Sequence, residues 1–244
     1  GRDVDGGWAE YVCVPQENVV SLPDGLSLRE SAWAASVAAA LHAVRLAQIE
    51  PGESVAILGC GALALVAAQW ARIMGAHQVL LTSSHSRRLR LAGEMWLGET
   101  CDAREIDPVA WCRDLTQGQG VDMVLETTGR SATLGQALRM ARPRGRVIAA
   151  AVPQTEIRIE RATLSRMVRK QIRVLGSWGA AQAPLPIDEW RLSLESMAGR
   201  RIDVRHLTGD QITFAQAPDL LRQMWEGELD CVGTLLGPAS RTLP

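Results

Sequence analysis

The sequence predicts an α/β protein with a doubly wound parallel β-sheet, in which helices cover both faces. Over residues 54 to 178, short apolar runs rich in β-branched side chains alternate with amphipathic or alanine-rich segments. This alternation is typical of strand–helix–strand units. The composition is 47% hydrophobic and 22% charged over 244 residues, which excludes a disordered, collagen-like or coiled-coil chain.

The residues before this block predict a strand, a turn and a helix. Residues 8–14 alternate between apolar and polar side chains, as in a half-buried strand. Leu22, Pro23, Asp24 and Gly25 are typical of a turn. A long alanine-rich helix is predicted over residues 28–47.

The block itself predicts five strands with helices between them. The strands are expected at residues 54–58, 78–82, 122–126, 146–150 and 172–175, with a short candidate strand at 99–102. The helices are expected at residues 62–74, 86–97, 108–115, 131–141 and 163–170, and Gly75 is expected to end the first of them. Beyond the block, residues 187–198 and 214–225 predict amphipathic helices, and residues 231–236 a last strand.

A glycine-rich loop follows the first strand of the block and opens its first helix. Residues 59–64 have the pattern G-x-G-x-x-A. Gly59 permits a tight turn, Gly61 lets the backbone approach a pyrophosphate, and the small Ala64 allows the helix to pack closely on the strand. The dipole and free amides at the start of this helix favour an anion. The loop predicts dinucleotide binding, with a purely structural tight turn as the alternative.

The end of the second strand bears on the choice between NAD and NADP. A carboxylate about 20 residues past the glycines usually binds the ribose hydroxyls of NAD. The strand here ends at Ser83 and Ser84, with Arg87 and Arg88 following, and has no carboxylate. Hydroxyls and a guanidinium would donate hydrogen bonds to a 2′-phosphate, which favours NADP. Alternatively, a serine caps the next helix and the arginines are solvated.

Charge and metal-ligand patterns exclude several functions. The chain has 26 Lys+Arg and 27 Asp+Glu, so no general electrostatic argument supports nucleic-acid or anionic-membrane binding. No apolar run of about 20 residues or basic–apolar leader is present, and we expect a cytoplasmic protein. Five scattered cysteines and four histidines show neither disulfide nor zinc spacing, so we expect no metal site within the chain.

Several segments together resemble one family. Gly6 to Tyr11, Leu41 to Val44, Pro51 to Val55, the glycine loop and Asp122 to Gly129 resemble the zinc-dependent medium-chain alcohol and polyol dehydrogenases. Within this family, residues 164–178 and 188–190 are most similar to the galactitol-1-phosphate 5-dehydrogenases. The resemblance covers nearly the whole chain.

The resemblance implies a Rossmann coenzyme-binding domain set into an incomplete GroES-like catalytic domain. Residues 52–178 would form the Rossmann domain, residues 1–51 the remainder of the catalytic domain with a connecting helix, and residues 179–244 the return to it. The implied reaction is hydride transfer between a nicotinamide coenzyme and a small-molecule alcohol or carbonyl compound, such as a polyol or sugar alcohol. A homodimer or homotetramer is also implied, with residues 173–176 pairing between subunits.

The resemblance further implies a catalytic zinc, which acts as a Lewis acid in the family. The family's zinc ligands precede the segment that corresponds to Gly6, so we expect them to be absent from this chain and name no catalytic residue. Ala35 and Ser36 stand where the family has a Glu-Pro pair near the metal. Two alternatives therefore stay open: a catalytically inactive, truncated cofactor-binding protein, and a zinc-independent NADPH reductase of the same superfamily.

The expected coenzyme site draws on three parts of the Rossmann domain. Its residues are Gly59, Gly61, Ala62, Leu63 and Ala64 at the pyrophosphate, Ser83, Ser84 and Arg88 at the adenosine ribose, and Thr127, Thr128, Ala151, Gly176 and Ser177 along the coenzyme. A local basic cluster, Arg161, Arg166, Arg169, Lys170 and Arg173, would either neutralise a phosphorylated substrate or form a solvated helical face.

Overall fold

The computed structural model describes residues 4–180, 188–226 and 232–237. The chain forms two compact units. One unit contains the described residues up to Ala34 together with those from residue 188 onward, and the other begins at Ala35 and contains the remainder.

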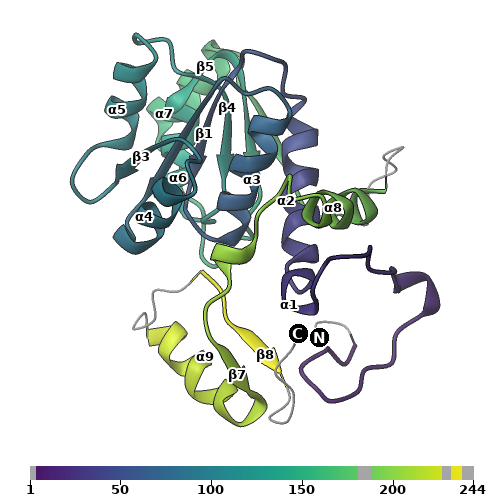
Figure 1. The fold of residues 1–244 in the computed structure, drawn as a ribbon. Helices are drawn as coiled ribbons and strands as arrows, with labels where there is room; N and C mark the ends of the chain where they lie inside the picture. Colours follow the sequence, from purple (N-terminus) through teal and green to yellow (C-terminus); the bar gives the residue numbers. More distant parts are fainter. Residues whose placement is uncertain (1–3, 181–187, 227–231, 238–244) are drawn as a thin grey trace. The chain divides into compact units, whose positions relative to one another are not determined.

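The second unit is built on six parallel strands in the order β3-β2-β1-β4-β5-β6 (Figure 1). The strands are β1 Ser54–Leu58, β2 Gln78–Ser83, β3 Glu99–Asp102, β4 Val121–Glu126, β5 Ala141–Ala149 and β6 Arg173–Gly176. The order reverses between β1 and β4, and the carboxyl ends of strands beside such a switch point form the usual ligand crevice. This strand order is that of the Rossmann fold, so the predicted doubly wound sheet is confirmed.

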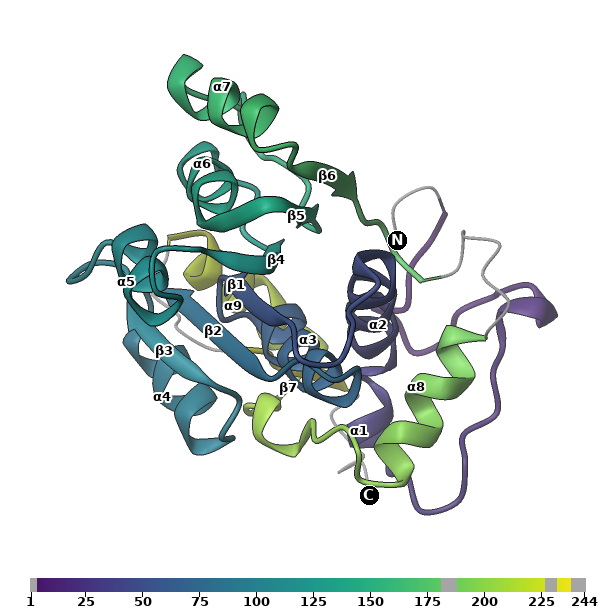
Figure 2. The same cartoon turned by 90° about the horizontal axis from the view of Figure 1, so that it is seen from above.

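Helices cover both faces of this sheet (Figure 2). The helices α2 Ala34–Ala47, α3 Ala62–Ile73 and α4 Ser86–Glu94 lie on one face. On the other face lie α5 Pro108–Leu115, α6 Ser131–Met140 and α7 Arg161–Arg169. The indole Nε1 of Trp70 on α3 donates to the Val37 carbonyl of α2 at 3.1 Å and joins these two helices.

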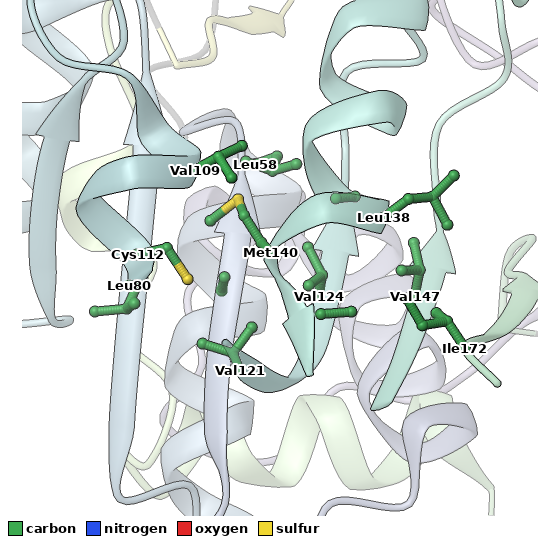
Figure 3. Close-up of a cluster of buried hydrophobic side chains, with 13 residues drawn as sticks. Leu58, Leu80, Val109, Cys112, Val121, Val124, Leu138, Met140, Val147 and Ile172 are labelled. Carbon is green, nitrogen blue, oxygen red and sulfur yellow. The ribbon is translucent and has the colours of Figure 1, made fainter. Parts of the chain in front are cut away.

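An apolar cluster fills the space between the sheet and the α5–α7 face (Figure 3). Leu58, Leu80, Val124 and Val147 point into it from four strands, and Met140 closes it from the end of α6. Strands covered on both faces cannot alternate apolar and polar residues. This burial explains why the block consists of nearly continuous apolar runs.

A buried arginine ties the end of α2 to the sheet. Arg146 on β5 is 5% exposed, pairs with Glu53 and donates to the Ala47 and Gln48 carbonyls. The free carbonyls at a helix C-terminus attract a cation in this way. At the start of the neighbouring strands, the amide and hydroxyl of Ser54 donate to the Asp122 carboxylate at 2.8 and 2.7 Å.

The strands and helices predicted within the block are confirmed, and all ends but one match or lie within three residues of the prediction. The candidate strand at 99–102 is β3, and β5 begins five residues before its predicted start. Gly75, with φ +100°, ends α3 as expected.

Two predictions for the preceding residues are wrong. Residues 8–14 form no strand, and no described strand pairs with them. The single helix expected over 28–47 is two helices, α1 Leu28–Ser31 and α2, separated by a turn at Trp33. The turn allows the buried Trp33 indole to donate to Thr208 Oγ1 at 2.6 Å, a contact within the first unit that local helix propensity cannot predict.

The first unit contains α1 and two further helices, α8 Glu189–Ala198 and α9 Ala217–Glu226. The strands β7 Gln211–Thr213 and β8 Leu235–Gly237 pair in parallel, and β7 was not predicted. Short 3₁₀ turns at Gln16–Asn18, Arg205–Leu207 and Phe214–Gln216 complete the unit. Both predicted helices are confirmed, while Ile187 and Cys231, where two predicted elements begin, lie outside the described residues.

Candidate functional site

A cavity of about 370 Å³ lies at the carboxyl ends of β1, β2 and β4. Ligands bind at this edge in open parallel sheets, because the loops after the strands and the amino termini of the helices meet there. The cavity is lined by Gly59, Cys60, Gly61, Thr82, Ser83, Ser84, His85, Arg88, Ala103, Thr127, Thr128, Arg130, Ala132, Thr133 and Gln136.

The two glycines of the loop after β1 meet different constraints. Gly59 has φ +112°, its amide donates to the Thr82 carbonyl at 2.8 Å, and a Cβ there would come within 2.3 Å of Thr127 Oγ1. Gly61 is the N-cap of α3, has φ −76° and has nothing within 4 Å of the position of a Cβ. Gly59 is therefore required by the turn, whereas the backbone at Gly61 is open to a ligand.

The start of α3 offers hydrogen-bond donors. The first amides of a helix have no partner within the helix, and Gly61 provides no side chain to cap them. Ala62 and Leu63 belong to this first turn and are partly buried, while Ala64 is fully buried against the sheet. The amino terminus of α3 therefore fits a negatively charged group.

The end of β2 forms a second wall of the cavity. Ser83 Oγ accepts a hydrogen bond from the His85 amide at 3.1 Å, and the N-cap of α4 is His85, without a side-chain capping bond. The alternative that Ser83, Ser84 or Ser86 caps this helix is therefore wrong. Both Ser83 and Ser84 line the cavity together with Arg88.

The loop after β4 forms the third wall and is fixed by one carboxylate. Glu126 is 2% exposed and accepts hydrogen bonds from the amide and hydroxyl of Thr128, at 2.8 and 2.6 Å, and from the Gly129 amide at 3.0 Å. Thr127 Oγ1 donates to the Leu58 carbonyl at 2.8 Å. These bonds hold both threonines in the cavity wall.

Residues 62–199 match the sequence pattern that defines zinc-binding dehydrogenases, which is more than half of the chain. The chain belongs to the zinc-binding dehydrogenase family. The resemblance seen in the sequence is thereby confirmed.

Members and neighbours of the zinc-binding dehydrogenase family match most of the chain. Galactitol 1-phosphate 5-dehydrogenase of Escherichia coli (strain K12) is 29% identical over 233 residues, 94% of this chain and 67% of that protein. Sorbitol dehydrogenase of Bacillus subtilis (strain 168) is 27% identical over 236 residues, 96% of this chain and 64% of that protein.

A solved structure adds a bound coenzyme to this comparison. A protein from Sinorhizobium meliloti 1021, crystallised bound to NADP, superposes with a TM-score of 0.79 at 30% identity, covering 96% of this chain and 66% of that one. The chain thus spans about two thirds of the length of the proteins it matches.

The structure gathers seven of the predicted coenzyme residues around one cavity. They are Gly59, Gly61, Ser83, Ser84, Arg88, Thr127 and Thr128. Ala62, Leu63 and Ala64 lie beside the cavity in the first turn of α3, whereas Ala151, Gly176 and Ser177 follow β5 or end β6 and do not line it. The sequence analysis did not include Arg130, Thr133 and Gln136 at the start of α6, because only the order of the strands brings this helix beside the glycine loop.

The cysteine within the glycine loop is not a nucleophile. Cys60 is buried, and this burial raises the pKa of its thiol to about 12, although the nearby charge of Arg88 opposes the shift. The thiolate is the reactive form of cysteine. At neutral pH Cys60 is therefore an apolar wall residue.

The described residues do not fit the zinc that the family name implies. Within 4–180, 188–226 and 232–237, no three His, Cys, Asp or Glu side chains come together in a group that could hold a metal ion. His42 is buried on α2.

No helix among the described residues has the length and apolar character needed to cross a membrane.

Proposed function

We propose that this chain supplies the coenzyme-binding part of an NAD(P)-dependent medium-chain dehydrogenase. The observation that carries the proposal is the cavity at the switch point of the sheet, in which the open Gly61 backbone, the start of α3 and Arg88 face one space. The nicotinamide ring, when bound, accepts or donates the hydride.

The residues of the chain would bind and orient the coenzyme. The Gly61 backbone and the first amides of α3 would bind the pyrophosphate, because these donors and the helix dipole favour a negative charge. Thr127, held by the Leu58 carbonyl, and Thr128, held by Glu126, would line the path of the coenzyme. Arg130, also in the cavity wall, would add a second cation beside the phosphates.

We further propose that NADP is preferred over NAD. The end of β2 presents Ser83, Ser84 and Arg88 to the cavity, and none of the cavity-lining residues is acidic. A guanidinium and hydroxyls bind a 2′-phosphate, whereas a carboxylate would repel it. The NADP-bound protein from Sinorhizobium meliloti supports this preference.

The proposed substrates are polyols, sugar alcohols with or without a phosphate group, and other secondary alcohols. This class rests on the names of two relatives, galactitol 1-phosphate 5-dehydrogenase and sorbitol dehydrogenase. We derive no chemical step from zinc, because the described residues do not provide its ligands.

Coenzyme titrations test the proposal. We expect the purified chain to bind NADPH at least tenfold more tightly than NADH in calorimetric titrations. Ser83→Asp should reverse this order, because it places a carboxylate at the 2′-phosphate. Ser86→Asp, which adds the same charge three residues later, at the start of α4 and outside the cavity lining, is the matched control. Failure of the chain to bind either coenzyme would overturn the proposal, and a preference for NADH would overturn its NADP part.

A further inference from the structure

Three cations from the ends of two helices lie on the edge of the sheet opposite the coenzyme cavity. Arg113 is in the last turn of α5, Arg166 is in the last turn of α7, and Lys170 follows α7 directly. In a doubly wound sheet each helix returns the chain to the edge where the next strand begins. These residues therefore lie where β4 and β6 start, whereas Gly59, Ser83 and Thr127 lie where strands end.

Hydrogen bonds fix the position of the central cation. Arg166 Nη2 donates to the carbonyl of Arg139 at 3.1 Å and to that of Ala141 at 3.4 Å, at the carboxyl end of α6. Its Nε is buried and has no hydrogen-bond partner among the described residues. The guanidinium is thus held at the carboxyl end of α6. In Figure 2, α6 lies between α5 and α7.

The positive charge of the cluster is not compensated. Burial lowers the pKa of Lys170, and the charges of Arg166 and Arg113 lower it further. Burial also lowers the pKa of Arg166, and Arg113 adds to this shift. No carboxylate of the described residues forms an ion pair with any of the three. The carboxyl ends of α5, α6 and α7 contribute only about half a negative charge each, which together is less than the three positive charges.

We propose that Arg113, Arg166 and Lys170 form a binding site for a multiply charged phosphate group of a small molecule. Guanidinium and ammonium donors are the usual partners of phosphate, and an anion would remove the repulsion between the three cations. Arg166 is already fixed by the α6 carbonyls, so less side-chain freedom is lost on binding. The cluster has only three cations, which fits a diphosphate better than an extended nucleic acid or a membrane surface.

Calorimetric titration with inorganic pyrophosphate tests the site. The full chain is used in about 0.15 M salt. It is first saturated with NADPH, which fills the coenzyme cavity. We expect binding at one site, weakened at least tenfold by Arg113→Gln and by Lys170→Gln. Arg161→Gln is the control, because it removes a positive charge from the opposite end of α7. Both test variants should unfold at the wild-type temperature or above without anion, since they relieve repulsion.

Three results would overturn the proposal. They are absence of pyrophosphate binding, binding that both test variants retain, and binding of RNA or phosphatidylserine vesicles but not of pyrophosphate. The site does not depend on the proposed function. Weaker pyrophosphate binding by Lys170→Gln would place the anion at this site even if the chain binds no coenzyme.

Discussion

Two glycines in one loop differ in what they do, although the sequence motif treats them alike. Gly59 adopts a left-handed backbone and packs against Thr127, so its missing Cβ serves the fold. Gly61 has an ordinary backbone conformation, and no atom lies within 4 Å of the position that a Cβ would occupy. The missing Cβ therefore leaves room for a ligand. This difference can be measured.

Gly59→Ala should destabilise the protein, whereas Gly61→Ala should impair coenzyme binding alone. For Gly59→Ala we expect a loss of at least about 2 kcal/mol in the free energy of unfolding, from backbone strain and the contact with Thr127. For Gly61→Ala we expect wild-type stability and NADPH affinity at least tenfold lower. Denaturant unfolding and NADPH titration measure the two effects, and a stable Gly59→Ala protein would contradict the structural assignment.

The residues of the site were predictable where the geometry of a single loop requires a particular residue type. The motif identifies Gly59 and Gly61 because a tight turn and a close ligand approach both demand a missing side chain at a fixed spacing. Arg130 and Gln136 enter the same cavity from a helix some 70 residues later in the chain. No local pattern brings these residues to the glycine loop, since only the strand order places β4 beside β1.

At the scale of an element, the loop between β4 and α6 depends on the buried carboxylate of Glu126. This side chain accepts hydrogen bonds from two backbone amides and one hydroxyl, and the Gly129 amide among them is buried. An unsatisfied buried donor is costly. The loop geometry and the cavity wall therefore depend on one residue that itself does not line the cavity.

Glu126→Gln should lower the free energy of unfolding by about 2 kcal/mol, because an amide NH₂ would face a backbone N–H in place of one acceptor oxygen. NADPH affinity should fall as well, since Thr128 and Gly129 lose hydrogen bonds that fix the cavity wall. Chemical denaturation and coenzyme titration measure the two effects. The exposed Glu156→Gln is the matched control and should change neither. Wild-type stability of Glu126→Gln would contradict this role.

Helices and strands were predictable where the burial of their side chains is visible in the local pattern of apolar residues. The strands between residues 54 and 178 are covered on both faces and appear as continuous apolar runs. Residues 8–14 have the alternation of a strand, but a strand needs a partner, and no described segment pairs with them. The turn at Trp33 depends on the contact with Thr208, which is 175 residues away.

At the scale of the whole molecule, buried ion pairs determine how stability responds to acid. Burial raises the pKa of Glu53, but hydrogen bonds from Arg146 and the Glu50 amide, with the charge of Arg146, bring it below its ordinary 4.5. Burial likewise raises the pKa of Asp122, but Ser54 and Arg142 lower it below 3.8. Both carboxylates are thus more acidic folded than unfolded.

The free energy of unfolding should therefore be constant from about pH 7 to pH 5 and fall below about pH 4.5. A lowered carboxyl pKa contributes stability that is present above the unfolded value and is lost as pH falls through the folded value. Asp122→Asn should reduce the slope in the acid range, and Glu156→Gln should leave it unchanged. Denaturant titrations at several pH values measure the slope. Stability that rises on acidification would contradict the expectation.

The exposed edge of the sheet leads to a prediction about assembly. All four residues of β6 are exposed, and β5 is the only described strand that pairs with it. We expect two chains to pair through β6 and to form a dimer or tetramer, measurable by light scattering. Val174→Lys should yield monomer, because edge lysines block strand pairing. Val168→Lys on α7, where the valine is also exposed, is the control. A wild-type monomer of 26.4 kDa would contradict the prediction.

The strand order also determines when the sheet can be completed on the ribosome. The strands β1, β2 and β3 are adjacent in space and are synthesised first, so half of the sheet can form while the rest is still untranslated. The free edge of β1 then has no neighbour until Glu126 has been made, since β4 is the strand that covers it. At about 5–20 residues per second, the wait from Leu58 to Glu126 lasts several seconds. During this interval, the nascent chain exposes the edge of an apolar strand, and a chaperone that binds extended apolar segments would find its site there.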